Sequence, residues 1–310
     1  MTISQGGLIQ AVDYNTLRTG VSNLLGDGYG DRGYGQTVAA DIDVIAGTTV
    51  VSATPTTLKQ WVALYGDMKK IADHQGTDIT TLKNAYDNNI KSGSLIQYSD
   101  INLIATTLAT LDTNRLTIGD QTQYSIESLA SSQRTTQWGS PVKPTVQHTF
   151  RIEFGSAADA RYFFNAGGQI LFTASRSGGT TPWTQNSDWT TLLSAMGTIA
   201  FGYSGVTASS GNTVSGFKDV TTATLIYSKG GYGGAGGTTY AANDYNITAT
   251  LDSGKFLTFN IYFNDDKTTL FANQDYVDGT LTSTIQIKRP SGTNVSLVKP
   301  NAVNTAELSA

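Results

Sequence analysis

The residues that could act as acids, bases or nucleophiles are few and scattered in this sequence. Its two histidines, His74 and His148, stand far apart, and neither belongs to a recognisable nucleophile motif. A Ser-His-Asp arrangement needs all three groups within hydrogen-bond reach, and this pattern does not indicate one. Glu153 and Asp188 could be proposed as a glycosidase pair, but nothing in the sequence places them across one cleft. The sequence therefore predicts no catalytic site and no enzyme.

Metal and cofactor sites have equally weak signals. Cysteine is absent, which excludes disulfides and thiolate-bound metals. Four carboxylates follow a predicted strand late in the chain: Asp265, Asp266, Asp275 and Asp278. Loop carboxylates are typical Ca²⁺ ligands, but this spacing is not that of an EF-hand, and turns favour Asp in any case. Whether the four hold a cation stays open, and no cofactor is predicted.

Two glycine-rich segments invite a phosphate-loop interpretation. Residues 230–237 lack the lysine and the hydroxyl residue that would complete such a loop, and no helical pattern follows them. They are better explained as a hairpin tip, where Tyr232 could touch a partner or a glycan. Residues 26–35 are interpreted in the same way, and Tyr29 and Tyr34 make a docking role plausible there.

The composition suits a particle in which much surface is buried between subunits, and it also suits extracellular β-proteins. Only 14% of the 310 residues are charged, against about 25% in typical soluble domains. The net charge is −4 and no Lys/Arg cluster exists, which argues against nucleic-acid binding. The N-terminus lacks a signal-peptide pattern, and no apolar run approaches the length of a membrane span. We therefore expect copies of the chain and neighbouring proteins as partners, without membrane insertion.

Helical periodicity fills residues 1–120, and one helix start occurs there twice. Leu-Ile-Gln followed by Asp appears in both copies at a constant offset. The positions that carry the repeat are Leu8, Ile9, Asp13 and Tyr14 in the first copy, and Leu95, Ile96 and Asp100 in the second. We predict that Asp13 and Asp100 are N-caps and that the apolar residues beside them bind a partner. The alternative is that two helices of one bundle merely begin alike.

The hydrophobic period changes to two in the second half of the chain. Residues 121–144 are expected to be a connector, because Gly139, Pro141 and Pro144 break regular structure there. Strands are predicted at 146–154, 169–175, 198–203, 223–227, 244–251, 255–263 and 280–288. Residues 145–300 are therefore assigned to an antiparallel β-sandwich with short inserted helices, and 301–310 to a polar tail. The fold class predicted is α+β.

Residues 156–172 are predicted to form a short helix, a forced turn and a strand. Ser156 is the expected cap, and Asn165, Gly167 and Gly168 are expected to end the helix. Three consecutive aromatic residues precede this turn and must be buried in the core or against a partner. Arg161 is expected to pair with an acid in its own domain or to reach a neighbouring subunit.

Several motifs resemble structural proteins of tailed-bacteriophage particles, especially those with contractile tails. The motifs are Asp13-Tyr14-Asn15, Gly33-Tyr34-Gly35-Gln36, Arg161–Gly168 and residues 189–199, so they occur in both halves of the chain. The resemblance implies a non-enzymatic component of the virion, assembled in the host cytoplasm. It leaves open whether that component belongs to the neck or collar, a tail fibre or the baseplate.

Two rival functions remain at this point. The first is a receptor-binding module of a tail fibre, whose loops at 204–217 and 230–237 would bind host glycans. The second is a particle-borne polysaccharide hydrolase that would use Glu153 or Asp188.

Overall fold

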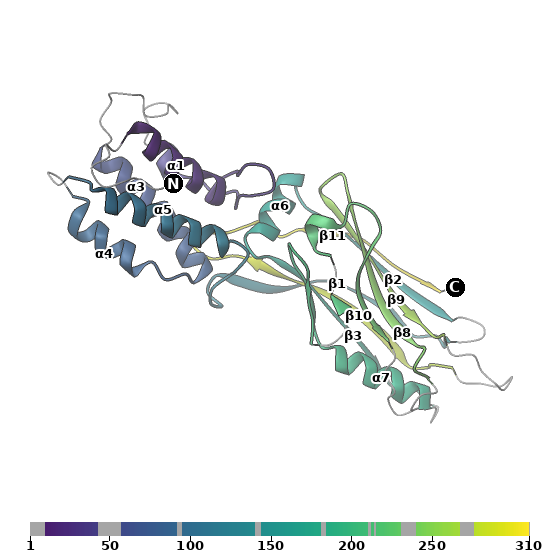
Figure 1. Cartoon of the computed structure of the whole chain (residues 1–310). Helices are drawn as coiled ribbons and strands as arrows, with labels where there is room; N and C mark the ends of the chain where they lie inside the picture. The colour runs from purple at the N-terminus through teal and green to yellow at the C-terminus, as the bar shows by residue number, and fades with distance from the viewer. Residues whose placement is uncertain are drawn as a thin grey trace. The chain divides into compact units, whose positions relative to one another are not determined.

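The computed structural model describes residues 10–42, 57–91, 95–139, 144–180, 184–209, 212–213, 215–230, 240–266 and 276–309. The chain has an α+β fold with two antiparallel sheets, as predicted (Figure 1). It divides into two compact units. Unit 1 comprises Met1–Ser125, Arg161–Gly168 and Pro290–Leu297, and unit 2 comprises Ile126–Ala160, Gln169–Arg289 and Val298–Ala310.

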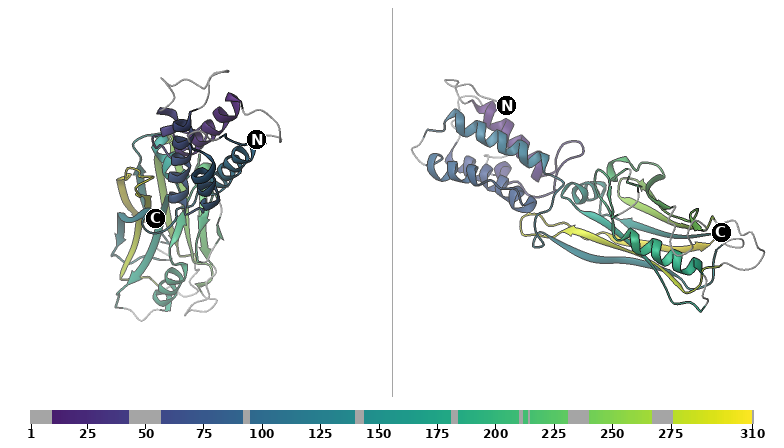
Figure 2. Two further views of the ribbon diagram at one scale, coloured as in Figure 1. Left: turned by 90° about the vertical axis from the view of Figure 1, so that its left-hand side faces the viewer. Right: turned by 60° about the horizontal axis from the view of Figure 1, so that its bottom comes forward.

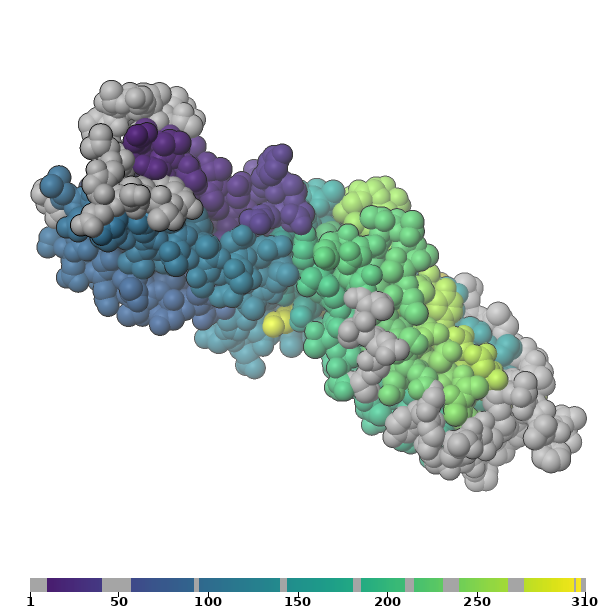
Figure 3. Space-filling model, in the orientation of Figure 1, coloured from purple at the N-terminus to yellow at the C-terminus, as the bar shows by residue number. Residues whose placement is uncertain are grey.

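Unit 1 contains the helices of the first part of the chain. They are α1 (Ala11–Leu25), α2 (Ala39–Ile42), α3 (Leu58–Gln75), α4 (Thr80–Asn89) and α5 (Tyr98–Thr113). The purple and blue residues of these helices form much of the surface of this unit in the space-filling view (Figure 3). Apolar side chains at helical spacing bury one face of each long helix. The rings of Tyr14 on α1 and Trp61 on α3 meet edge to face in the core, with centroids 5.0 Å apart.

The duplicated motif opens α1 and α5 with the same local geometry, but its aspartates are not N-caps. Gln10 and Gln97 hold the N-cap positions, so Asp13 and Asp100 lie inside the first turn. The carboxylate of Asp13 accepts a hydrogen bond from the Gln10 backbone N–H at 2.7 Å. The carboxylate of Asp100 accepts the equivalent bond from Gln97 at 3.0 Å. The predicted helix starts were therefore three residues late, because an acid at the third helical position stabilises the same free N–H groups as a cap does.

Unit 2 contains two antiparallel sheets. The five-stranded sheet has the order β1 (Tyr124–Arg134), β10 (Thr280–Pro290), β3 (Gln169–Ser177), β4 (Ile199–Phe201), β5 (Val206–Thr207). The six-stranded sheet has the order β11 (Asn301–Ser309), β2 (Thr145–Glu153), β9 (Phe256–Asn264), β8 (Asp244–Asp252), β7 (Thr224–Gly230), β6 (Asn212–Thr213). All seven predicted strands are present. Helix α7 (Thr184–Met196) packs on β3 (Figure 2).

The core of unit 2 forms between the inner faces of its two sheets. Strands β2 and β9 bury every second residue, as a half-buried strand must. Phe259 on β9 meets Phe172 on β3, with ring centroids 4.9 Å apart, and Phe201 on β4, at 5.4 Å. These contacts join the two sheets into the predicted sandwich.

Two predicted boundaries are wrong. The expected connector contains strand β1, and the expected polar tail contains strand β11, which pairs with β2. Both strands lie at sheet edges, and their described side chains are exposed or half-buried except Ser132 and Arg134 of β1. Such strands are held by backbone hydrogen bonds, so their sequences lack the apolar alternation that marks a half-buried strand.

We predict that removal of either capping carboxylate destabilises its helix. Asp13→Ala should lower the free energy of unfolding by about 1 kcal/mol. Asp100→Ala should lower it by about 2 kcal/mol, since the buried Asp100 also accepts a bond from Asn89 Nδ2 at 3.0 Å. Urea unfolding followed by far-UV circular dichroism measures both. The control is Asp87→Ala, which removes only an exposed pair with Lys83. An Asp100→Ala effect no larger than that of the control would contradict this account.

The buried histidines predict a specific pH dependence of stability. Desolvation lowers the pKa of His74 and of His148 from 6.5 to about 4. Because each folded-state pKa lies below the unfolded value, their contribution is fully present above pH 6.5 and is lost as the pH falls towards 4. The loss should be about 3 kcal/mol per histidine, at about 1.4 kcal/mol per pKa unit. Unfolding free energies measured at intervals across this range should show it.

A histidine variant separates this effect from the protonation of carboxylates. His148 Nδ1 lies 2.8 Å from Ser283 Oγ in the core of unit 2. His148→Gln has no group that titrates in this range and should therefore remove about half of the histidine contribution to the slope. An unchanged slope in that variant would contradict the assignment to the histidines.

Candidate docking site formed by a clamped loop and the α1–α5 groove

The loop 26–35 of unit 1 folds back on itself after α1. The N–H of Gly35 donates to Gly26 O at 2.9 Å, and the N–H of Gln36 donates to Leu25 O at 2.9 Å. Glycines 28, 30, 33 and 35 all have positive φ, as left-handed backbone requires. A Cβ on Gly28 would stand 2.2 Å from Arg32 O. The four glycines therefore allow the left-handed backbone conformation that this compact loop adopts.

The end of α6 (Ala157–Asn165) clamps this loop. Arg161 donates from Nη1 to Gly30 O and from Nη2 to Asp27 O, both at 2.8 Å. Asn165 Nδ2 donates to Asp31 O, four residues further along the same helix face. Arg161 therefore holds backbone carbonyls of its own chain. It binds these carbonyls in place of the acid expected in its own domain, and its contact with a neighbouring subunit stays a prediction.

The predicted ends of α6 are confirmed. Ser156 Oγ accepts a hydrogen bond from Asp159 N at 3.0 Å. At the other end, Gly168 N donates to Phe163 O at 2.8 Å, and Gly167, with φ of 78°, donates to Phe164 O at 3.1 Å. This is a Schellman turn, which satisfies the last carbonyls of the helix. Phe163 and Phe164 are buried, so the core interpretation of the aromatic run holds for these two rings.

The two tyrosines of the loop have different environments. Tyr34 is fully buried, donates to Arg115 O at 2.7 Å and accepts from Gln75 Nε2 at 2.8 Å. Burial raises the pKa of Tyr34 above its ordinary value. The docking role considered for Tyr34 is therefore wrong. Tyr29, in contrast, has 83% of its surface exposed on a loop that is otherwise held in place.

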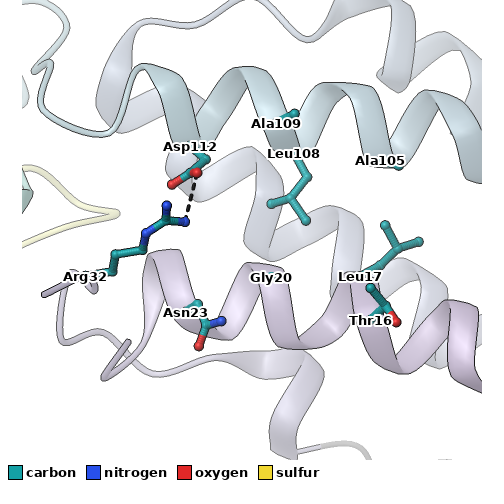
Figure 4. A pocket seen from close by; sticks show the side chains of 9 residues that line it. All are labelled: Thr16, Leu17, Gly20, Asn23, Arg32, Ala105, Leu108, Ala109 and Asp112. Carbon is teal, nitrogen blue, oxygen red and sulfur yellow. Dashed lines mark hydrogen bonds and ion pairs between the residues drawn. The ribbon is translucent and has the colours of Figure 1, made fainter. Parts of the chain in front are cut away.

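A groove of about 490 Å³ lies between α1 and α5, beside the loop (Figure 4). It is lined by Thr16, Leu17, Gly20, Asn23, Arg32, Ala105, Leu108, Ala109 and Asp112. Leu17 and Leu108 supply apolar surface, and an ion pair stands at one end, where Arg32 Nη1 lies 2.8 Å from Asp112 Oδ2. Gly20 permits the close approach of the helices, because a Cβ there would stand 2.6 Å from Leu108 Cδ2.

The remaining predicted partner-binding residues fall into three groups. Tyr14 is fully buried against Trp61, so the prediction that it contacts a partner is wrong. Ile96 is half-buried against the core of unit 1, whereas Leu95 is 88% exposed. Leu8, Ile9 and Tyr232 lie outside the described residues. Of these residues, Leu95 is thus the one that the structure presents to solvent.

The candidate acids have structural partners in unit 2. Glu153 Oε1 pairs with Lys255 Nζ at 2.8 Å, and Asp188 is buried on α7. Asp278 accepts from Asn186 Nδ2 at 2.6 Å and pairs with Arg176 Nη2 at 3.2 Å.

Neither a metal centre nor a membrane span is found in the part of the chain that the structure describes. No group of three or more His, Asp or Glu residues that could hold a metal ion occurs within these ranges, which exclude Asp275. The same ranges contain no helix long and apolar enough to span a membrane. The proposed glycan loops at 204–217 and 230–237 fall partly outside them.

Sequence reasoning missed the residues that shape the site. The ion pair between Arg32 and Asp112 joins positions far apart in the sequence, and Gly20 resembles any helix glycine. One usable signal existed for Gly20: a glycine inside a helix costs about 1 kcal/mol relative to alanine, which suggests a packing reason.

We predict that Arg161→Ala releases the loop without unfolding the chain. Loss of two charge-assisted bonds should increase amide hydrogen exchange at residues 27–35 and lower the unfolding free energy by about 1–2 kcal/mol. Hydrogen exchange resolved by mass spectrometry measures the first effect. Arg151→Ala, which removes an exposed pair with Asp252, is the matched control and should leave the loop unchanged. Equal exchange of the loop in both variants would show that Arg161 does not hold it.

Comparisons with protein-family models, with curated proteins and with solved structures return no match for this chain.

Proposed function

We propose that this protein is a non-enzymatic structural and assembly protein of a tailed-phage particle. In this proposal it forms part of the neck or collar, a fibre or the baseplate, and it contacts other copies and neighbouring virion proteins. The loop 26–35 and the α1–α5 groove of unit 1 are the docking site. The observation that carries the proposal is a loop clamped by Arg161 that presents Tyr29 with 83% of its surface exposed.

Binding is strongest where the contact residues are already ordered. An ordered loop loses little conformational entropy on association, so more of the contact energy appears as affinity. Tyrosine is enriched among the residues that dominate binding energy at protein interfaces. Here Arg161, Asn165 and the Arg32–Asp112 pair fix the loop around Tyr29.

The groove beside the loop supports the same interpretation. Its apolar lining from Leu17 and Leu108 suits a single inserted side chain of a partner. The Arg32–Asp112 pair at its end offers both charges to polar groups around that side chain. An exposed aromatic side chain beside a groove with both apolar and charged lining suits a protein interface.

The composition and the motif resemblance add independent support for a particle component. A chain with only 14% charged residues has few groups that must be desolvated when its surface is covered by neighbours. The motifs that resemble virion proteins include Gly33-Tyr34-Gly35-Gln36 in the loop and Arg161–Gly168 in the clamp. The residues of the resemblance are therefore partly those that build the site.

A tagged copy of the chain in a phage that encodes it tests the proposal. The tagged wild-type chain should be present in purified particles, and Tyr29→Ala should reduce its incorporation at least about tenfold, as expected for a residue that contributes about 1.4 kcal/mol or more. Val62→Ala, a change at a half-exposed apolar residue on α3, is the control. Absence of the wild-type chain from particles would refute the particle role. Equal incorporation of Tyr29→Ala and the control would refute the docking site.

A glycan-binding role is the alternative, because an exposed tyrosine ring also provides a flat face for a sugar. The same variants separate the two functions. Wild-type binding to a glycan array that Tyr29→Ala abolishes, with incorporation into particles unchanged, would favour the receptor-binding alternative.

A further inference from the structure

Strand β11 is an edge strand of the six-stranded sheet in unit 2. It ends the six-stranded sheet, with β2 on one side, and no described strand lies on its other side (Figure 1). The opposite ends of the two sheets are β5 and β6, which have two residues each. β11 has nine residues. An edge of this length presents a row of backbone N–H and C=O groups that another strand can pair with.

The other long edge strand, β1, has a lysine side chain bonded to one of its backbone carbonyls. Lys299 Nζ donates to Ser128 O of β1 at 3.0 Å and lies 3.5 Å from Glu127 Oε2. Arg289 Nη2 also pairs with Glu127, at 2.7 Å. Charged side chains at an edge are a common protection against strand addition. Of the two long edges, β11 is therefore the one that is open to pairing.

β11 lacks most of the features that block strand addition. Residues 301–309 contain no proline and no basic residue, and Glu307 is their one charge. Glu307 Oε1 accepts from Arg134 Nη1 of β1 at 2.6 Å, which neutralises that charge within unit 2. A bulge interrupts the ladder between Ala302 and Asn304. The regular segment 304–309 beyond the bulge is therefore the part of β11 to which another strand can add.

We propose that β11 pairs with β11 of a second copy, antiparallel, so that two six-stranded sheets become one continuous sheet across a twofold axis. A strand edge is self-complementary in this arrangement, because each copy offers the same donors and acceptors in opposite direction. The occupant is a second copy rather than a charged partner, since the segment carries no unpaired charge that would select one. This inference does not depend on the docking site at Tyr29.

Charge also selects the register. Pairing centred on Ala306 places Glu307 of each copy opposite Thr305 of the other. Pairing centred on Glu307 would place the two carboxylates directly opposite one another, which is unfavourable. The inferred interface is therefore centred on Ala306, a residue that lies opposite Thr149 in the β11–β2 ladder.

The register provides a sharp test on the purified full chain. Sedimentation velocity from low to several hundred micromolar should show a concentration-dependent dimer. Ala306→Lys places two like charges opposite one another and should weaken the dimer at least about tenfold. Ala302→Lys adds the same charge on the other side of the bulge and should change the dimer little. Both variants should keep the melting temperature and circular dichroism of the wild type.

Hydrogen exchange identifies the contact strand. Backbone amides of residues 304–309 should become more protected as the wild-type concentration rises, and they should not do so in Ala306→Lys. A wild-type chain that stays monomeric, or a dimer that Ala306→Lys leaves unchanged, would overturn the inference. So would protection of β11 only when a different protein is added. A dimer that is absent from particles would support this inference and refute the particle role alone.

Discussion

The Schellman turn at Gly167 and Gly168 is the constraint on which the candidate site depends. It ends α6 within unit 1, and the chain then continues as β3 of unit 2. Because the helix ends at a fixed residue, Arg161 and Asn165 are held on the face that meets the loop 26–35. The carbonyls of that loop have no helix or sheet to accept from, and the clamp provides their donors. A left-handed residue other than glycine at position 167 would strain this turn.

Much of the fold could be predicted from the sequence because burial leaves a periodic pattern. The alternation in β2 and β9 and the helical stripe of α3 gave those elements directly. The edge strands β1 and β11 left no such pattern, since their pairing uses backbone groups that every residue has. The aspartates of the duplicated motif were recognised as helix-start residues, but the glutamine before each takes the cap position.

The site was predicted only in part, for a similar reason. Exposed Tyr29 and clamping Arg161 were both singled out, but their partners lie far away in the sequence. Periodicity could not distinguish Tyr29 from Tyr34, since both stand between glycines in one loop. The difference arises from Gln75 and Arg115, which bind the hydroxyl of Tyr34 inside the core. Such pairings are properties of the tertiary structure, and local sequence does not contain them.

Gly20 determines how closely Leu108 of α5 packs against α1 at the groove. One hydrogen atom occupies the place where a methyl group would collide with Leu108, so the Leu108 side chain of α5 packs directly against the backbone of α1. Arg32 belongs to the loop and Asp112 to α5, and their ion pair spans the same gap. Arg32 thus belongs both to the loop that carries Tyr29 and to the lining of the groove, so one side chain joins the two parts of the candidate site.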